Sequence, residues 1–288
     1  MPSPLSIIIP VFNEAKCIAQ TLSKLSDILE KSNFEYEIIV VDDGSTDNTR
    51  QNIPDTKHTR VISHESNMGY GAAIKTGLTK TVFERVCITD ADGTYPLDEI
   101  PKLNTLMQDQ DMVVGSRTGA QVEYSWLRKI PKFFLKYYIE FITDKEVPDI
   151  NSGLRIFNKA KALKFYKLYP NGFSFTTTIT IAFITNGFNV LFDPISYKKR
   201  IGKSKIQPIR DTLRFFQLIT RLGMYFAPLK ILTPFIFVLG FSFLASLVYD
   251  IFFLEDITDK SVLLLLFTLN TIFFALIADM IYRTNKWS

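Results

Sequence analysis

Two long apolar segments near the C-terminal end constrain the fold of this chain more than any other feature. They run from Leu229 to Leu254 and from Val262 to Tyr282. A helix of about 20 apolar residues crosses the roughly 30 Å hydrocarbon core of a bilayer, so each segment is long enough to span a membrane. A pair of buried helices in a soluble protein is the alternative. Two such segments joined by a short connection favour a transmembrane hairpin.

The charges around the two segments predict how the hairpin is oriented. The connection, residues 255–260, is short and net acidic. Basic residues lie outside the pair: Arg210, Arg214, Arg221, Lys230, Arg283 and Lys286. Because basic residues favour the cytoplasmic side, we expect a two-span protein of the cell membrane with its N-terminal domain and both termini in the cytoplasm. The first residues lack the basic flank of a signal peptide.

Residues 208–228 connect the spans to the rest of the chain. Pro208 suits the first turn of a helix, and apolar residues then alternate with arginines at helical spacing. A basic, aromatic-rich amphipathic helix of this kind lies along anionic membrane lipids. A helix packed against the protein core is the alternative.

Residues 1–207 alternate short apolar runs with helical patterns, which is typical of an α/β domain with a parallel sheet. The predicted strands are 5–10, 37–41, 60–63, 86–89 and 112–115, with strand-like polarity again near 154–157 and 189–192. Asn13 is the expected cap of a helix that runs to Lys31, and the loop 42–47 is expected to cap another. Cys17 and Cys87 are read as small buried apolar residues because neither has a partner at metal-ligand spacing. The net charge of +4 is mild, and no nucleic-acid partner is expected.

Asp90 and Asp92 follow the predicted strand 86–89 directly. Ligands of open parallel sheets bind at the carboxyl ends of the strands. Two carboxylates there can hold a divalent cation and, through it, a diphosphate. The same spacing recurs at Asp109 and Asp111, before the strand 112–115, where a solvated loop is the better interpretation.

Three further acidic residues, Glu14, Asp42 and Asp43, follow the first two predicted strands. We expect all these acids to meet at one edge of the sheet. Carboxylates accept hydrogen bonds from the N–H and O–H groups of a base and a ribose. The glycine-rich stretch 67–71 allows close approach of a ligand, but it lacks the Walker lysine and the strict dinucleotide fingerprint.

Together these motifs resemble family 2 glycosyltransferases. The resemblance rests on SIIIPVFNE (6–14), VVDDGSTD (40–47), Asn67 with Gly69, and DAD (90–92), in the family's order. GSR (115–117), NSGLR (151–155) and RIGKSK (200–205) are similar to the polyprenyl-phosphate branch, which includes dolichol-phosphate mannose and glucose synthases. The resemblance implies a nucleotide-diphospho-sugar transferase fold of the GT-A type, followed by the membrane hairpin.

The resemblance also implies roles for the acidic residues. Pro10, Glu14 and Asp43, with Asp42 beside it, are expected to hold base and ribose of a UDP- or GDP-linked sugar. Asp90 is expected to face the nucleotide, and Asp92 together with Asp90 to hold Mg or Mn. Gly93-Thr94 replaces the Leu-Gln usual in mannose synthases. This departure leaves the metal geometry and the sugar open.

The expected acceptor, a polyprenyl phosphate, is itself an anionic nucleophile, so no strong general base is needed. Its phosphate requires cations, and arginine binds phosphate through two parallel hydrogen bonds. Arg117 and Arg200 are the first candidates, Ser204 and Lys205 support them, and Arg128 is a further candidate. Asp149 is expected to orient acceptor or sugar. Direct in-line transfer of a hexose, glucose or mannose, would invert the anomeric centre.

Two other functions are weighed against this one. A polysaccharide-type glycosyltransferase with a sugar acceptor needs a base and a Gln/Arg-x-x-Arg-Trp-like motif, whereas Trp126 is followed by Leu127 and Arg128. A catalytically inactive membrane scaffold is the other alternative. Intact Asp90, Asp92 and Arg117 argue against it.

Overall fold

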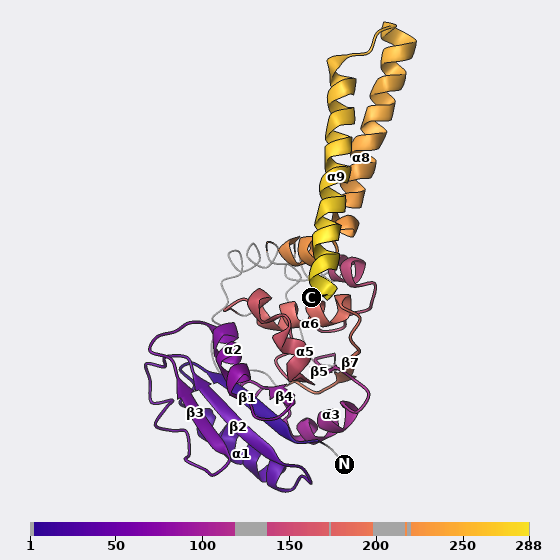
Figure 1. The fold of residues 1–288 in the computed structure, drawn as a ribbon. Coiled ribbons are helices and arrows are strands. Elements are labelled where there is room, and N and C mark those ends of the chain that lie inside the picture. Colours follow the sequence, from indigo (N-terminus) through magenta and orange to yellow (C-terminus); the bar gives the residue numbers. More distant parts are fainter. Residues whose placement is uncertain (1–2, 119–136, 173, 198–216, 218–219, 288) are drawn as a thin grey trace. The chain divides into compact units, whose positions relative to one another are not determined.

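The computed structural model describes residues 3–118, 137–172, 174–197, 217 and 220–287 (Figure 1). The chain divides into two compact units, and each is described by itself. The first contains residues 1–133 and 145–208, and the second contains 134–144 and 209–288. The domain boundary predicted at residue 207 stays a prediction, and residues 134–144 group with the C-terminal unit. The predicted amphipathic helix lies partly outside the described residues; residues 220–226 are helical.

The first unit is built on a seven-stranded sheet with the order β3-β2-β1-β4-β6-β5-β7. The strands are β1 (Leu5–Val11), β2 (Tyr36–Asp42), β3 (Thr59–Ser63), β4 (Arg85–Ile88), β5 (Met112–Ser116), β6 (Arg155–Asn158) and β7 (Val190–Pro194). All neighbours pair in parallel except β6, which runs antiparallel to both β4 and β5. The sequence predicts the strands but not the reversed direction of β6.

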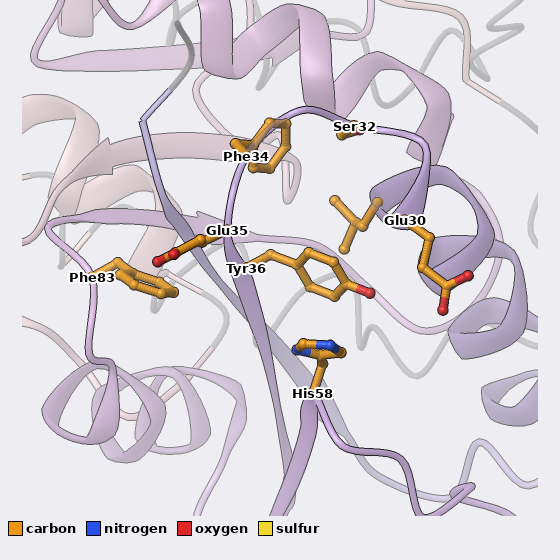
Figure 2. A pocket seen from close by; sticks show the side chains of 8 residues that line it. Glu30, Ser32, Phe34, Glu35, Tyr36, His58 and Phe83 are labelled. Carbon is orange, nitrogen blue, oxygen red and sulfur yellow. The ribbon is translucent and has the colours of Figure 1, made fainter.

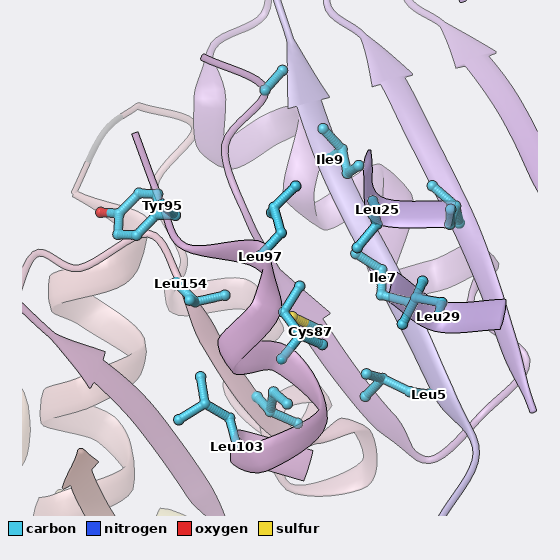
Figure 3. Packing of buried hydrophobic residues seen from close by; sticks show 14 of the residues in the cluster. Leu5, Ile7, Ile9, Leu25, Leu29, Cys87, Tyr95, Leu97, Leu103 and Leu154 are labelled. Atoms are coloured by element: carbon cyan, nitrogen blue, oxygen red, sulfur yellow. The ribbon is translucent and has the colours of Figure 1, made fainter. Parts of the chain in front are cut away.

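Side chains alternate between the two faces of the sheet along each strand. Because the strands carry apolar side chains on both faces, helices cover both. Ile7 and Ile9 pack on one face with α1 (Ile18–Glu30), η1 (Leu97–Glu99) and α3 (Ile100–Leu106), as Figure 3 shows. Ile8 packs on the other face with α2 (Tyr70–Lys80), α5 (Lys159–Leu163) and α6 (Phe175–Thr185). A short helix η2 (Tyr166–Leu168) lies between α5 and α6 in the chain. The unit is a three-layer α/β/α domain, and Cys87 lies in its apolar core as predicted.

Two local predictions are wrong. Helix α1 begins at Ile18, not after Asn13, and Asn13 adopts a left-handed conformation with φ 56°. Asparagine tolerates this conformation, and the Asn13 side chain accepts a hydrogen bond from the N–H of Thr46 in the neighbouring loop. No helix follows the loop 42–47; a turn does, in which Asp47 accepts from the N–H of Thr49. Both residues hold one loop to another and cap no helix.

The second unit contains two long apolar helices. Helix α8 (Pro228–Tyr249) continues through a π-helical stretch η3 (Asp250–Leu254), and α9 (Asp259–Trp287) returns. The segments Pro228–Leu254 and Asp259–Thr284 are long and apolar enough to cross a membrane, each with a mean hydropathy of 2.3. Their large apolar side chains are mostly exposed, Phe237 by 72% and Phe241 by 75%. Exposed apolar surface on this scale is typical of a lipid-facing or partner-facing surface.

The tip of the hairpin is held by a buried carboxylate. Asp250 accepts hydrogen bonds at Oδ2 from the N–H and hydroxyl of Thr258 and from the hydroxyl of Ser261. Thr258 directly precedes α9, so the side chain of the first η3 residue caps the start of the next helix. Near the other end, Asp279 pairs with Arg283 one turn later.

Candidate active site

The candidate site lies at the carboxyl edge of the sheet in the first unit. Strands β1, β2, β4 and β5 end there, and β6 begins there because it is antiparallel. Arg155, the first residue of β6, is paired with Ile88 of β4 and with Val114 of β5. The acidic residues after β1, β2 and β4 therefore meet the segments around Arg117 and residues 149–155 at one edge. This is the convergence that the sequence predicts.

The loops after β1 and β2 are interlocked by hydrogen bonds. The N–H of Asn13 donates to Ser45 Oγ at 2.9 Å, and the N–H of Glu14 donates to Thr49 Oγ1 at 2.8 Å. Asp42 is buried, and its Oδ1 accepts from the N–H of Ser45 at 3.0 Å. These contacts fix the backbone at Asn13 and Glu14. Pro10 is buried in β1 opposite Val41 of β2.

Asp43 holds the glycine-rich turn that begins α2. Its Oδ1 accepts from the N–H of Met68 at 2.9 Å and lies 2.7 Å from His64 Nδ1. Its Oδ2 accepts from the N–H of Gly69 at 2.8 Å. Gly69 has φ 104°, and a Cβ there would lie 2.4 Å from the carbonyl oxygen of Asn171, so only glycine fits. The buried carboxylate of Asp43 thus supports the turn, and its predicted contact with the nucleotide stays a prediction.

Asp90 and Asp92 are held in two different ways. Asp90 is half-buried, and its Oδ1 accepts from the hydroxyl of Tyr70 at 3.0 Å. Burial raises the pKa of Tyr70 and the Asp90 charge adds to the shift, so Tyr70 stays a neutral donor. Gly153 lies against the same carboxylate, where a Cβ would be 2.9 Å from Asp90 Oδ2.

Asp92 is buried, and its Oδ1 accepts from both the N–H and the hydroxyl of Thr94, at 3.2 and 2.6 Å. The residue that departs from the mannose synthase pattern therefore contacts the candidate metal ligand through its hydroxyl group. The turn between the two aspartates is also fixed from α1, because Thr21 Oγ1 donates to the carbonyl of Ala91 at 2.8 Å.

Arg117 forms a close ion pair with Asp149. Its Nε lies 2.7 Å from Asp149 Oδ2, and its Nη2 lies 2.9 Å from Oδ1, which is a bidentate arrangement. The backbone N–H of Arg117 also donates to Oδ2, at 3.0 Å. The guanidinium lies over the ring of Tyr197, with 5.3 Å between its Cζ and the ring centroid. The bidentate fork predicted for a phosphate thus holds Asp149 in the structure, through Nε and Nη2 of Arg117.

The pair is ionised across a wide pH range. Burial alone would raise the pKa of Asp149, but hydrogen bonds and the charge of Arg117 outweigh burial and lower it. The pKa of Arg117 is raised by Asp149 despite the burial that opposes the shift. Asp149 is therefore a fixed anion that sets the position of a fixed cation.

Three residues of this edge were missed by the sequence reasoning: Tyr70, Tyr95 and Arg155. Tyr70 donates to Asp90, and Tyr95 accepts the N–H of Gly153 on its hydroxyl at 2.6 Å. Arg155 is completely buried and binds backbone carbonyls of the 149–155 segment. Tyr70 and Arg155 lie inside quoted motifs, but a motif does not say which side chain points inward.

Several predicted site residues cannot be placed. Arg128, Arg200, Ser204 and Lys205 lie outside the described residues. The second Asp-x-Asp pair, Asp109 and Asp111, lies in the loop between α3 and β5, at the opposite edge of the sheet. Asp111 there accepts from the N–H of Asn189 and pairs with Lys161.

A shallow cavity of about 470 Å³ also lies at that opposite edge, at the amino ends of β2, β3 and β4 (Figure 2). Its walls include Tyr36 and His58, whose ring centroids are 4.8 Å apart. The cavity therefore does not belong to the candidate site.

The residues of the carboxyl edge fit a divalent cation shared with a diphosphate. Within the described ranges, no cluster of three or more His, Cys, Asp or Glu side chains is placed to hold a metal. Asp90 and Asp92 supply one or two carboxylates, which is how Mg²⁺ is held when phosphate oxygens and water complete its shell. Hard oxygen ligands suit Mg²⁺ and Mn²⁺ alike.

The strand order with one antiparallel strand and paired aspartates at the carboxyl edge define a GT-A-type α/β protein. Solved structures of this fold include glucosyl-3-phosphoglycerate synthase from Mycobacterium tuberculosis in complex with uridine-diphosphate. It aligns with a TM-score of 0.62 and 16% identity over 76% of this chain and 79% of that one. Mannosyl-3-phosphoglycerate synthase from Rubrobacter xylanophilus aligns with a TM-score of 0.58 and 17% identity over 76% and 72%. At these identities the likeness establishes the fold alone.

The sequence identifies the family. Residues 6–165, more than half of the chain, match the profile described as glycosyl transferase family 2, and the chain belongs to this family. The dolichyl-phosphate beta-glucosyltransferases of Saccharomyces cerevisiae and Homo sapiens are 28% and 27% identical over 73% of this chain, and the matches cover 71% and 72% of those proteins.

An undecaprenyl-phosphate 4-deoxy-4-formamido-L-arabinose transferase from Proteus mirabilis is 32% identical over 161 residues. That match covers 54% of this chain and about half of the relative, 49% of its length.

Proposed function

We propose that this protein transfers a hexose, with inversion, from a nucleotide-diphosphate sugar to a polyprenyl phosphate at the cytoplasmic membrane face. The observation that carries the proposal is the meeting of Asp90 and Asp92 with the Arg117–Asp149 pair at one sheet edge. Such an edge provides carboxylates for a metal–diphosphate and a cation for a second phosphate. The two apolar helices of the second unit provide a reason for a lipid acceptor.

The relatives support the same reaction class. Three similar proteins are named as transferases that act on undecaprenyl or dolichyl phosphate. Among the structural relatives, the Mycobacterium tuberculosis synthase was solved with Mn²⁺ and uridine-diphosphate-glucose. A glucose or mannose donor linked to UDP or GDP is therefore proposed for this chain. The positive-inside bias of the hairpin supports a cytoplasmic site.

On the donor side, the chain's residues bind and orient. Glu14 and Asp43, with Asp42 and Pro10, are proposed to hold base and ribose in the interlocked loops. Asp90 and Asp92 are proposed to hold the cation, with Thr94 fixing the Asp92 carboxylate at 2.6 Å. A bound Mg²⁺ or Mn²⁺ would neutralise charge on the leaving diphosphate.

On the acceptor side, the main problem is electrostatic, since two anions must approach each other. Arg117 is proposed to meet the acceptor phosphate through the N–H groups that Asp149 does not use. Asp149 holds the guanidinium at a fixed angle, which reduces the conformational entropy lost on binding. Arg200, Ser204, Lys205 and Arg128 are proposed as further contacts. The lipid phosphate attacks directly, so no base is assigned.

A donor panel tests the proposal. The full chain in phospholipid vesicles is incubated with polyprenyl phosphate, Mn²⁺ and one radiolabelled nucleotide sugar at a time. We expect one donor to label the lipid phosphate, with an anomeric configuration opposite to that of the donor. Parallel reactions omit the lipid phosphate or replace it with an oligosaccharide. Label in the oligosaccharide, or no transfer from any donor, contradicts the proposal.

A further inference from the structure

Arg155 is an arginine with no exposed surface at the start of the central strand β6. All five of its N–H groups meet oxygen acceptors. Nε and Nη2 bind the carbonyl of Ser152, Nε at 3.1 Å, and Nη2 also lies 3.4 Å from the carbonyl of Ile150. Nη1 donates to the carbonyl of Thr176 at 2.9 Å and to Thr180 Oγ1 at 2.8 Å.

These acceptors are all neutral. Within the part of the chain that the structure describes, no carboxylate forms an ion pair with Arg155. Burial lowers the pKa of Arg155 to about 10, so the group is still charged at neutral pH. Burying a charge costs desolvation free energy, and proteins with well-packed apolar residues in its place are often as stable or more stable. Stability alone therefore does not explain this arginine.

Two of the carbonyls that Arg155 binds, those of Ile150 and Ser152, lie in the turn directly after Asp149, the residue that positions Arg117. Asp149 directly precedes Ile150, and its Oδ1 accepts the N–H of Asn151 at 3.1 Å. The same turn is tied to helix α6 from its other side, because Thr177 Oγ1 donates to Asn151 Oδ1 at 2.6 Å. Arg155 thus holds the inner side of the 149–152 turn to α6, and the Asp149 carboxylate projects from that turn.

We propose that Arg155 is a positioning residue that sets the place of Arg117 by fixing the 149–152 turn that carries Asp149. The inference rests on the proposed function, since it assigns Arg117 to the acceptor phosphate. Arg155 itself reaches no substrate, because it is fully buried. Its effect passes through backbone carbonyls to one carboxylate, and from there to a bidentate pair at 2.7 and 2.9 Å.

The first arm of the test is kinetic. Arg155→Met keeps much of the side-chain volume and removes all five donors. We expect kcat/KM for the lipid phosphate to fall by about tenfold to a hundredfold, because misplacement of a positioning group by about 1 Å has effects of this size. The KM for the nucleotide sugar should change by less than about threefold. An equal loss for both substrates contradicts the proposal.

The matched control is Arg85→Met at the opposite edge of the sheet. Arg85 is partly buried and donates from Nη1 to the carbonyl and side chain of Asn104, at 2.7 and 3.0 Å. It lies at the start of β4, away from the candidate site. We expect acceptor kinetics close to those of the wild type. A loss as large as that of Arg155→Met contradicts a role specific to the 149–152 turn.

The second arm is a double-mutant cycle with Arg117→Lys. If Arg155 acts through Arg117, Arg155→Met should have little further effect once the Arg117 fork is lost, since residues in one network are not additive. Additive losses in the double mutant contradict the proposal.

The third arm does not depend on catalysis. Hydrogen exchange is compared at the amides of Arg117 and Asn151, which both donate to Asp149, and at β2 amides as an internal control. Arg155→Met should speed exchange at the first two while β2 is unchanged. Unchanged exchange at both amides overturns the proposal. If the wild-type chain forms no product, the proposed function fails and this arm still tests the anchoring.

A second variant keeps the test informative if Arg155→Met does not fold. Thr180→Val leaves the guanidinium in place and removes one acceptor of Nη1. The same pattern is expected with a smaller loss of about threefold to fivefold for the lipid phosphate, because the other hydrogen bonds of Arg155 remain and the effect on Arg117 is indirect. A Thr180→Val chain with wild-type acceptor kinetics and wild-type exchange contradicts the proposal.

Discussion

The carboxyl edge of the sheet differs in charge between its two sides. On the β1–β4 side the functional candidates are acids, Asp42, Asp43, Asp90 and Asp92, and backbone N–H groups and hydroxyls of neighbouring loops donate to them. On the β5–β6 side the candidates are arginines. Arg117 is held by one carboxylate, and Arg155 is held by neutral carbonyls.

The difference matches the proposed reaction, in which one side receives a metal and a diphosphate and the other a lipid phosphate. Acids with buried hydrogen-bond partners stay in place when a cation arrives. An arginine paired on one edge keeps its other N–H groups for an incoming anion.

The largest effect is expected from Arg117→Lys on the β5–β6 side. Lysine keeps the charge but cannot reproduce the fork that Asp149 binds. We expect kcat/KM for the lipid phosphate to fall by about a hundredfold, the size of the loss of one bidentate charged contact. The KM for the donor should be nearly unchanged. Steady-state kinetics with each substrate varied in turn provides the measurement, and Arg85→Lys is the control. If kcat/KM for the nucleotide sugar falls more than kcat/KM for the lipid phosphate, the assignment of Arg117 to the acceptor is contradicted.

Asp43→Asn tests the β1–β4 side through stability. The carboxylate accepts two backbone N–H groups and lies at 2.7 Å from His64, whereas an amide has one acceptor oxygen and would turn N–H groups toward donors. We expect a loss of about 2 kcal/mol in the free energy of unfolding, the effect of an unsatisfied buried donor. Thermal unfolding in detergent measures it. Asp55→Asn, an exposed aspartate, is the control. Equal stability of the two variants contradicts the proposed support of the Gly69 turn.

A smaller effect is expected from Thr94→Val. The substitution removes the hydroxyl that donates to Asp92 and nearly keeps the shape of the side chain. We expect the Mn²⁺ concentration for half-maximal activity to rise about tenfold, since partners behind a metal ligand tune its affinity. Thr79→Val, on the exposed face of α2, should leave it unchanged. A change in the KM for the lipid phosphate without a change in the metal requirement would contradict the assignment of Thr94 to the metal ligand Asp92.

The smallest effect is expected from pH. The pKa of Asp149 is lowered in the folded chain, because hydrogen bonds and the charge of Arg117 outweigh burial. A depressed pKa adds stability above the unfolded value of about 3.9, and this stability is lost as the pH falls through the folded value. The protection factor of the Arg117 amide, which is the intrinsic exchange rate divided by the observed rate, should therefore stay constant between pH 8 and 5. A loss of protection near pH 6 would show that the pair titrates in that range and contradict the account.

The sequence predicts the β1–β4 side well. Strands that end in acids, followed by polar loops, are local patterns, and the carboxyl edge of a parallel sheet brings them together. The two Asp-x-Asp pairs differ only in their position relative to the strands. Asp90 and Asp92 follow β4, whereas Asp109 and Asp111 precede β5.

The β5–β6 side is much less predictable. The antiparallel β6 brings residues 149–155 to the edge by long-range pairing, and no local pattern specifies its direction. Helix α6, which holds Arg155, is rich in threonine and isoleucine and carries no clear amphipathic period because it is buried on nearly all sides. The N-cap prediction for Asn13 is wrong because asparagine is common both at helix N-caps and at left-handed loop positions.

In the proposed reaction Asp92 couples a divalent cation to the nucleotide, whereas the Asp-x-Asp pair at Asp109 and Asp111 does not. The measurement is binding of a nucleoside diphosphate to the full chain over a range of Mn²⁺ concentrations. We expect wild-type protein and Asp109→Asn to bind it in a strongly Mn²⁺-dependent manner, and Asp92→Asn to lose most of that dependence. Equal Mn²⁺ dependence in wild type and Asp92→Asn would contradict the account.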